Sequence, residues 1–383
     1  MKVPFFRLSF GKEEKREVLD VLRSGWVTSG LKVQKLESRI INLTGAKYAA
    51  AVSSATAGLH LVLKSLDIGA GDEVITSPYT MAATVEAILY TGARPVLADI
   101  DPVSLNIDPG AVEKKITKKT KAILPVDIAG CPCDYRPLKR LGRKYNIPLV
   151  ADAAHSLGGK YEGRMVGALA DAAVFSFYST KNITTGEGGM VVTDKKRLID
   201  RVRHLSLHGM TSSGWKRYQG GSWRYDITDL GYKYNLSDLA AALGVGQLAR
   251  FNEMQDRRIQ LVRRYLDSLR DLHDYIELPF YSNIDDHAWH LFIIRINRDK
   301  WKIGRDRLIT ELEKAGVGCG VHFIPIYKLS YFRRKLKYDA SDFPHCESAF
   351  LRVISLPFYV DLKISEVDYV CRTLKNLRIK FGR

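Results

Sequence analysis

The chain has 383 residues, of which 46% are hydrophobic, and its formal net charge is +17 at pH 7. This length is typical of two or three domains with sizeable buried cores, and no apolar run approaches the roughly 20 residues needed to span a bilayer. The first residues lack the apolar stretch of a secretory signal, so we expect a cytoplasmic protein without a membrane span. The five cysteines are scattered, with no CxxC pair and no HExxH motif, which favours free thiols and indicates no metal site.

The positive charge is spread along the chain instead of being gathered in one block. Basic residues cluster at 114–119, 139–144 and 333–335, where we expect solvated helix faces, and no DNA- or RNA-binding motif accompanies them. We therefore expect no nucleic-acid partner, and a basic surface that helps to attract a small anionic substrate. A non-enzymatic basic binding protein is the alternative.

Strands and helices alternate through the first half of the chain, which predicts βαβ units and a mostly parallel sheet. The next apolar run, 188–194, begins too soon after the strand that ends at 177 for a crossover helix, so we predict an antiparallel strand there. The predicted helices are 12–25, 33–45, 53–66, 80–92, 109–116 and 135–146, and the predicted strands are 48–54, 73–77, 95–100, 121–127, 147–152 and 172–177.

The second half predicts a helix at 195–207, a polar and aromatic loop at 208–235, and a long helix at 236–269 with a bend near Gly244 and Gly246. The remainder of the chain predicts a smaller α+β domain. We therefore predict a large domain over residues 1–250, which includes an N-terminal helix and arm, and a small C-terminal domain over residues 251–383. The predicted elements of the small domain are strands at 287–296 and 318–323 and helices at 305–316 and 364–378.

Three features of the first domain are candidates for chemistry. Ser53, Ser54 and Thr56 stand where a strand turns into a helix, so their hydroxyls join free N–H groups and a helix dipole that favour an anion such as phosphate. A plain helix N-cap is the alternative. Asp152 ends one buried strand and Lys181 follows another. Because ligands bind beyond the carboxyl ends of parallel strands, we expect both side chains to face one crevice.

This combination predicts pyridoxal phosphate (PLP) as cofactor. PLP needs a lysine that forms an imine, an acid against its pyridine nitrogen and a cradle for its phosphate. The lysine must be accessible as a neutral amine near neutral pH, and partial burial or a nearby cation lowers a lysine pKa. The motifs GxxxxGK[ST] and GxSxG are absent, and GVGCG follows a helix and enters a strand, so nucleotide hydrolysis, serine hydrolysis and dinucleotide binding lose their support.

Ordered blocks across most of the chain resemble the sugar aminotransferases of the DegT/DnrJ/StrS family, which are PLP enzymes of fold type I. The resemblance implies an aspartate-aminotransferase-like α/β fold, with a mostly parallel sheet, one antiparallel strand and a smaller C-terminal α+β domain. The blocks run from about Phe6 to the C-terminal helix and are SGWVTSG, VSSATAGLHL, DEVITSPYTMAAT, PVDIAGCPCD, ADAAHSLGGKYEGRMVG, FSFYSTKNITTGEGGMVVT, LGYKYNLSDLAAALG, HAWHLFIIR and GVHFIPIY.

The resemblance also implies which residues bind the cofactor. Lys181 would carry the internal aldimine, Asp152 would pair with the pyridinium nitrogen, and His155 would lie near the phenolic oxygen of the ring. Three further residues would bind the phosphate. These are Ala55, Thr56 and Ser176.

Two positions extend or depart from this pattern. Asn235 is implied to reach the phosphate of a neighbouring subunit, so the resemblance implies a homodimer with shared active sites. Met81 stands where the family often has an aromatic residue against the cofactor ring. Because methionine still offers apolar and sulfur–aromatic contact, we expect an altered cofactor affinity or spectrum and retained activity. Simple helix packing is the alternative for Met81.

The activity implied by the resemblance is a ping-pong transfer of an amino group from glutamate to a nucleotide-linked keto-sugar, with release of 2-oxoglutarate and a pyridoxamine phosphate intermediate. VSSATAGLH, GYKYNL and HAWHLFIIR look similar to the UDP-4-amino-4-deoxy-L-arabinose branch, whereas GVHFIPIY looks more like other branches. We expect C4 of a UDP-linked keto-sugar, in lipopolysaccharide or polysaccharide biosynthesis. A C3 or 6-deoxysugar aminotransferase acting on a dTDP- or GDP-sugar is the alternative.

PLP-dependent sugar dehydratases of this fold carry histidine in place of the lysine, so Lys181 argues against that chemistry.

Candidate substrate contacts come from three regions. Thr28 and Ser29 lie in the early loop and could contact the sugar. Arg224 and Tyr225 could hold a nucleotide diphosphate or order the long loop. His322 looks like a residue that lines the substrate cleft. Weaker candidates are His287 and His290, which also look like family positions that line this cleft, with a hydrogen-bonded core or interface histidine as the alternative for all three histidines. Glu187 could be a catalytic residue or a local structural contact.

Overall fold

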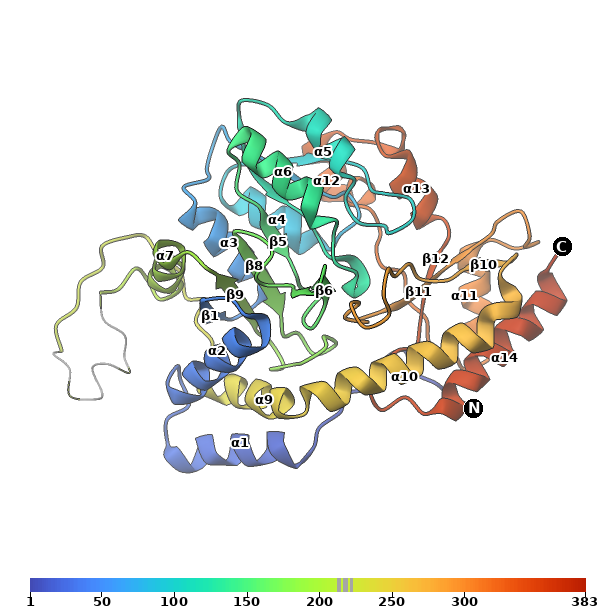
Figure 1. Ribbon diagram of the computed structural model, residues 1–383, viewed down its shortest axis with the longest axis horizontal. Helices are drawn as coiled ribbons and strands as arrows, with labels where there is room; N and C mark the ends of the chain where they lie inside the picture. The colour runs from blue at the N-terminus through green and yellow to red at the C-terminus, as the bar shows by residue number, and fades with distance from the viewer. Residues whose placement is uncertain (212–214, 216–219, 221–222) are drawn as a thin grey trace.

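A mixed sheet forms the centre of the larger unit in the computed structural model, which describes residues 1–211, 215, 220 and 223–383 (Figure 1). Its four-stranded part has the order β1 (Tyr48–Val52), β9 (Gly189–Thr193), β8 (Ala172–Ser176), β5 (Val150–Asp152), and its three-stranded part the order β3 (Arg94–Leu97), β2 (Glu73–Thr76), β4 (Thr120–Leu124). The two parts join where Ile123 bridges Leu149 and Val126 bridges Asp152 in parallel. β9 is antiparallel to both β8 and β1, so the predicted antiparallel strand is confirmed.

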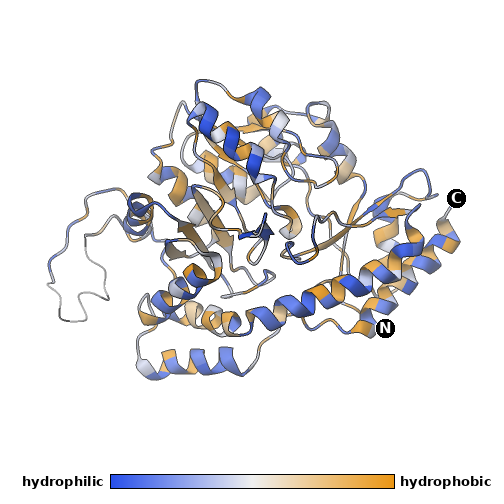
Figure 2. Ribbon diagram, viewed as in Figure 1, coloured by the Kyte–Doolittle hydropathy of each residue, from blue (hydrophilic) through white to orange (hydrophobic). Residues whose placement is uncertain are grey.

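Both faces of this sheet are apolar and covered by helices. In β8, Ala173 and Phe175 pack into one core, and Ala172 and Val174 pack into the other. This burial on both sides explains why the strands read as continuous hydrophobic runs, and Figure 2 shows the hydrophobic residues gathered on them. The first face packs against α2 (Leu31–Thr44), α5 (Pro109–Lys115), α6 (Tyr135–Tyr145) and α9 (Asp238–Ala249), and the second against α3 (Ala55–Ser65), α4 (Ala82–Tyr90) and α7 (Lys196–Ser206).

The predicted bend at Gly244 and Gly246 is wrong. α9 continues through both glycines, and the helix breaks later, at Arg250, whose φ of −110° and ψ of 9° separate it from α10 (Phe251–Leu269). Gly246 has another role, because a Cβ there would lie 2.5 Å from the Cα of Glu14. The glycine therefore lets α1 (Lys12–Ser24) approach α9 closely.

The smaller unit is an α+β layer, as predicted. Its antiparallel sheet has the order β10 (Ile276–Glu277), β11 (Phe292–Ile296), β12 (Val353–Leu356) and shares a core with α10, α11 (Arg305–Lys314) and α14 (Ile364–Phe381). The domain boundary predicted between residues 250 and 251 falls at the junction of α9 and α10 and stays a prediction. Short elements complete the chain: β6 (Lys160–Tyr161), β7 (Arg164–Met165), α12 (Ser330–Leu336) and α13 (Pro344–Phe350).

The strand predicted at 318–323 is wrong. Within this stretch only Gly320 makes a bridge, to Ser355, and the preceding Val317 bridges Val3 of the N-terminal arm. The segment leaves the sheet after Gly320 because its last residues turn toward the larger unit. There they join an apolar cluster that connects the two units, with Tyr79 and Leu97 from one side and Ile326 and Phe343 from the other.

The loop predicted at 208–235 follows α7 and is described at residues 208–211, 215, 220 and 223–235 (Figure 1). Its described ends are joined by bridges from Leu207 to Lys233 and from Met210 to Ile227. Several of its apolar side chains are exposed, with Trp223 at 78% and Leu230 at 90%. Within the described residues, no helix combines the length and the apolar character needed to cross a bilayer.

Candidate active site

Three strands bring their carboxyl ends to one edge of the sheet. Asp152 is the last residue of β5 and Ser176 the last of β8, and these strands pair in parallel. The third strand is β1, which ends at Val52. β9 lies between β1 and β8 and runs in the opposite direction, so its first residue, Gly189, pairs with both Val52 and Ser176. A cavity of about 480 Å³ opens at this edge, between the two units.

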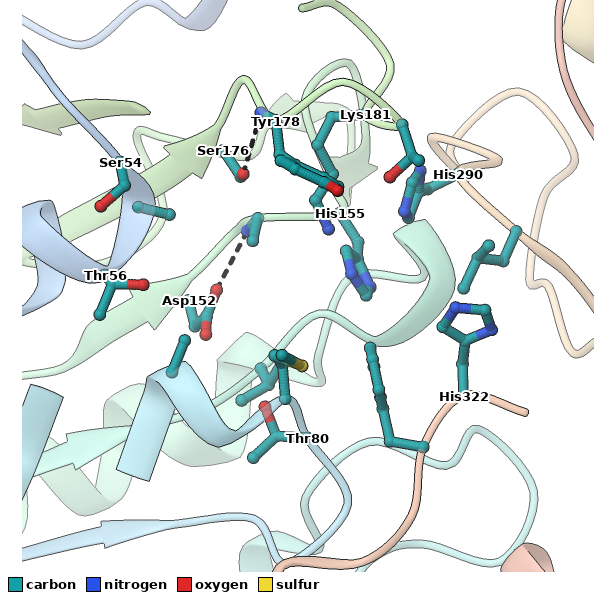
Figure 3. A pocket seen from close by; sticks show the side chains of 18 of the residues that line it. Ser54, Thr56, Thr80, Asp152, His155, Ser176, Tyr178, Lys181, His290 and His322 are labelled. Atoms are coloured by element: carbon teal, nitrogen blue, oxygen red, sulfur yellow. Dashed lines mark hydrogen bonds between the residues drawn. The ribbon is translucent and has the colours of Figure 1, made fainter. Parts of the chain in front are cut away.

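Eleven of the candidate cofactor and substrate residues named from the sequence line this cavity. Figure 3 shows Ser54 and Thr56 on one side of it and three histidines on the other, with Asp152 and Lys181 between them. The structure therefore brings the strand-end acid, the lysine and the helix N-terminus together. The eleven residues are Ser54, Ala55, Thr56, Met81, Asp152, His155, Ser176, Lys181, Glu187, His290 and His322.

Asp152 is held by a short chain of hydrogen bonds. Thr84 Oγ1 donates to its Oδ2 (2.7 Å), and the N–H of Ala154 donates to its Oδ1 (3.1 Å). Thr84 Oγ1 lies 2.7 Å from Thr80 Oγ1, and since its own proton goes to Asp152, it accepts from Thr80. Burial raises the pKa of Asp152, while these hydrogen bonds and Lys181 act in the opposite direction. Sequence reasoning missed Thr80 and Thr84, whose signal is a pair of hydroxyls four residues apart at the start of α4.

Lys181 is half-buried in the turn that follows β8. Loss of water around its Nζ lowers its pKa from 10.5 to about 8, and the charge of Asp152 opposes this shift. A backbone hydrogen bond from Lys181 N–H to Tyr178 O (3.0 Å) closes the turn. The next residue, Asn182, donates from Nδ2 to Ala288 O (2.6 Å). The lysine thus lies in a fixed turn, with an amine that is easier to deprotonate than that of an exposed lysine.

The N-terminus of α3 presents free donors to the cavity. Ser54 is the N-cap, and its Oγ accepts from Ala57 N–H (3.1 Å), as the N-cap alternative predicts. The N–H groups of Ala55 and Thr56 have no hydrogen-bond partner among the described residues. Gly189 lies against them, since a Cβ there would be 2.7 Å from the backbone nitrogen of Ala55. These donors, with the helix dipole, form a cradle suited to a phosphate.

His155 stands at the far side of Lys181 and is neutral. Its Nδ1 accepts from Ala129 N–H (3.3 Å), which places the ring proton on Nε2. Its ring stacks on Phe323, with centroids 5.7 Å apart, and lies 4.4 Å from that of His290. Burial and Lys181 hold its pKa well below the ordinary 6.5.

Comparisons with known proteins identify the family to which this site belongs. The model of the DegT/DnrJ/EryC1/StrS aminotransferase family matches residues 9–375. The chain belongs to this family. The spore coat polysaccharide biosynthesis protein SpsC of Bacillus subtilis is 42% identical over 377 residues, which cover 98% of this chain and 97% of SpsC.

Solved structures of DegT-family proteins share the whole fold. Spr1654 from Streptococcus pneumoniae, assigned as a sugar aminotransferase and solved in its PMP form, is 35% identical with a TM-score of 0.92 and covers 99% of this chain and 100% of its own. Helicobacter pylori PseC, an aminotransferase involved in the biosynthesis of pseudoaminic acid, is 28% identical with a TM-score of 0.92 over 100% of both chains. The predictions of the family, the aspartate-aminotransferase-like fold and PLP as cofactor are confirmed.

The residues at the sheet edge fit the cofactor of the DegT family. The free N–H groups of Ala55 and Thr56 suit its phosphate, Asp152 supplies a carboxylate for the pyridine nitrogen, and Lys181 supplies the amine. Met81 lines the same cavity and is 58% exposed, so it has room to contact the cofactor ring. The individual roles of these residues stay predictions.

Five of the residues predicted from the DegT-family resemblance and the early loop lie outside this cavity in the single chain. Asn235 donates from Nδ2 to Ser29 Oγ (2.7 Å). Thr28 is exposed, and its carbonyl accepts from Asp238 N–H (3.2 Å). The guanidinium of Arg224 lies over the ring of Trp223 (5.6 Å). The fifth, Tyr225, is 53% exposed on the extended loop. That Asn235 serves a partner's site stays a prediction.

His322 is one of the candidate substrate residues that line the cavity, together with the weaker candidates His290 and Glu187. Its Nδ1 lies 2.8 Å from Ser355 Oγ, and its ring stacks on Phe5 with centroids 5.6 Å apart. Burial lowers its pKa to about 4. His287 lies away from this cavity, and its Nδ1 accepts from Trp289 N–H (2.8 Å), which is the structural contact named as its alternative.

The rate of covalent PLP capture should rise with pH and reach half of its maximum near pH 8. The reason is that only the neutral amine of Lys181 attacks the cofactor, and its pKa is lowered to about 8. Stopped-flow absorbance of the apoenzyme mixed with PLP, from roughly pH 6 to pH 10, measures this, with a model amine correcting for the ionisation of PLP itself. A rate constant that keeps rising toward the ordinary lysine pKa of 10.5 would contradict the lowered value.

Asp127, which sequence reasoning missed, stabilises the turn after β5 through a hydrogen bond with Ser156. Its buried carboxylate accepts from Ser156 Oγ (2.6 Å), Cys133 N–H (2.8 Å) and Tyr135 Oη (3.0 and 3.1 Å). Asp127→Ala leaves these donors unpaired, so we expect the free energy of unfolding to fall by about 3 kcal/mol. Asp127→Asn, which keeps one acceptor, should lose about half as much. Urea unfolding of both variants measures this, and a loss below about 1 kcal/mol for alanine would show that the network is dispensable.

Proposed function

We propose that the protein, as a cytoplasmic homodimer, transfers the amino group of glutamate to C4 of a UDP-linked keto-sugar. The observation that carries the proposal is the meeting of Lys181, Asp152 and the free N–H groups of α3 at one cavity in a chain of the DegT family. PLP supplies the electron sink that makes the substrate carbon acidic when the cofactor is bound there.

Each residue has a defined task in this proposal. Asp152 keeps a proton on the pyridine nitrogen, and the Thr84 hydroxyl keeps the carboxylate in place. Lys181 would bind the cofactor and, as a free amine, would move the proton at the reacting carbon. Its pKa of about 8 allows both protonation states near neutral pH. Ala55 and Thr56, with Ser176, would hold the phosphate, and the Nε2–H of His155 would be available to the ring oxygen.

The choice of substrate is supported by relatives and by sequence. SpsC is described as a spore coat polysaccharide biosynthesis protein. PseC is described as an aminotransferase involved in the biosynthesis of pseudoaminic acid. We therefore propose a role in the synthesis of a surface polysaccharide or lipopolysaccharide. We choose UDP as the nucleotide and C4 as the aminated carbon because the sequence blocks at residues 52–60, 231–236 and 287–295 look similar to the UDP-4-amino-4-deoxy-L-arabinose branch.

A panel of nucleotide keto-sugars tests the substrate. UDP-, dTDP- and GDP-linked 4-keto and 3-keto sugars are each incubated with the PLP-loaded enzyme and ¹⁵N-glutamate, and mass spectrometry follows the label into the sugar. We expect amination of a UDP-4-keto sugar with the highest kcat/KM. Preference for a dTDP- or GDP-sugar, or for C3, would replace the substrate assignment, and amination of none of them would contradict the proposed reaction.

A further inference from the structure

His290 is fixed at the wall of the cavity by backbone contacts with the larger unit. Its own N–H donates to Ala129 O (2.9 Å). The N–H of Ala288 donates to Gly130 O (2.9 Å), and the carbonyl of Ala288 accepts from Asn182 Nδ2 (2.6 Å). The fold therefore determines where this imidazole stands, and it places the ring on the same side of the cavity as His155 and His322 (Figure 3).

The two ring nitrogens of His290 have different surroundings. Nδ1 is sealed from solvent and has no hydrogen-bond partner, whereas Nε2 is not sealed and also has no partner among the described residues. A buried N–H without an acceptor is rarer than a buried acceptor without a donor. The proton therefore belongs on Nε2, so the ring offers the cavity an N–H donor that no group of the described chain uses.

This donor is uncharged. His290 is 5% exposed, and burial, followed by the charges of His155 and Lys181, holds its pKa well below 6.5. Among the described residues that line the cavity there is no arginine, and Lys181 is the one lysine. The three histidines opposite the phosphate cradle are therefore polar but uncharged, and the acidic residues that line the cavity are Asp152 and Glu187.

On the basis of the proposed function, we propose that His290 binds both substrates in turn. Its Nε2–H donates to a carboxylate oxygen of the amino acid in the first half-reaction, and to a hydroxyl or carbonyl oxygen of the keto-sugar in the second.

A neutral donor suits a cavity that must accept two substrates of different charge. A fixed guanidinium would attract glutamate, but it would be left as an uncompensated buried charge when the uncharged sugar ring replaces the amino acid. An N–H of neutral imidazole hydrogen-bonds to both, and more strongly to the carboxylate, because a charged acceptor strengthens the bond. Loss of the donor should therefore weaken glutamate binding by about 10- to 100-fold and sugar binding by about 3- to 10-fold.

Two variants separate the donor from the space that it fills. His290→Phe keeps a ring but removes the donor, and His290→Gln keeps an N–H near the Nε2 position. His273→Phe is the matched control, since the His273 side chain is 77% exposed. If His290→Phe does not fold, His290→Leu, which is smaller and also lacks a donor, takes its place.

The measurements treat the half-reactions separately on enzyme of verified thermal stability and PLP affinity. Titration with α-methylglutamate, which lacks the hydrogen that transamination removes, reports donor binding through the cofactor spectrum. Single turnovers of the PMP-loaded enzyme with the keto-sugar aminated in the panel give its apparent affinity and its limiting rate. We expect both affinities to fall in His290→Phe and to recover in His290→Gln.

Three outcomes would overturn the inference: unchanged affinities in His290→Phe, a loss confined to one substrate, or no recovery in a folded His290→Gln. A wild-type enzyme whose cofactor spectrum does not respond to glutamate would instead contradict the proposed function, because that result does not involve His290.

Discussion

Lys181→Ala should leave a folded protein that binds PLP only reversibly and transfers no detectable amino group. The variant loses both the amine that attaches the cofactor and the base that moves the proton at the reacting carbon, so we expect kcat to fall by about 10⁴-fold or more. Borohydride treatment followed by peptide mapping should find the cofactor on residue 181 in the wild type and no stable adduct in the variant.

The matched control for this change is Lys195→Ala, whose side chain is 53% exposed and pairs with Asp171 (2.6 Å) away from the cavity. It should keep the wild-type rate and spectrum. Turnover by Lys181→Ala within about tenfold of the wild type would assign the amine to another residue.

Asp152→Asn should lower the rate of the glutamate half-reaction by about 10³-fold with little change in PLP content. An amide cannot keep the pyridine nitrogen protonated, so the cofactor becomes a weaker electron sink. The amide still accepts from Thr84 Oγ1, which now donates to Oδ2 of the carboxylate (2.7 Å), so the fold should survive. Single-turnover absorbance after mixing with glutamate measures the rate.

Variants of Thr84 and Asp127 separate the effect of the Asp152 charge from the effect of the hydrogen bond that holds it. Thr84→Val removes the hydroxyl that holds the carboxylate and should cost about tenfold in rate. Asp127→Asn changes a second buried carboxylate that lies outside the cavity, so it should lower stability and leave the half-reaction rate near that of the wild type. Equal rates for Asp152→Asn and the wild type would remove the carboxylate from the mechanism.

Most of the fold could be predicted because its elements follow local patterns. The antiparallel direction of β9 could be predicted because the segment between β8 and β9 is too short for a crossover helix, and its length can be read from the sequence. The break at Arg250 was not predictable, because neither glycine nor proline marks it. The stretch 318–323 has a strand-like composition but leaves the sheet to meet the larger unit, and tertiary packing of this kind overrides a local pattern.

The candidate site also contains residues that could be predicted from the sequence and residues that could not. Asp152, Lys181 and the start of α3 could be predicted, because the ends of parallel strands and the N-termini of helices have fixed positions in such a sheet. Thr84 could not, because its partner Asp152 lies 68 residues away in the chain, and neither could the contact of Asp127 with Ser156, which lies 29 residues away. His290 could be named only as a weak candidate, because the sealing of one ring nitrogen depends on contacts from the other unit.

The most direct test of the account is the absorption spectrum of the PLP-loaded protein during titration with glutamate alone. We predict that the visible band of the bound cofactor disappears, with one 2-oxoglutarate formed per site, and that the band returns when 2-oxoglutarate is added in excess. A protein that binds PLP at Lys181 but shows no spectral change with glutamate would contradict amino transfer from glutamate as the function of this site.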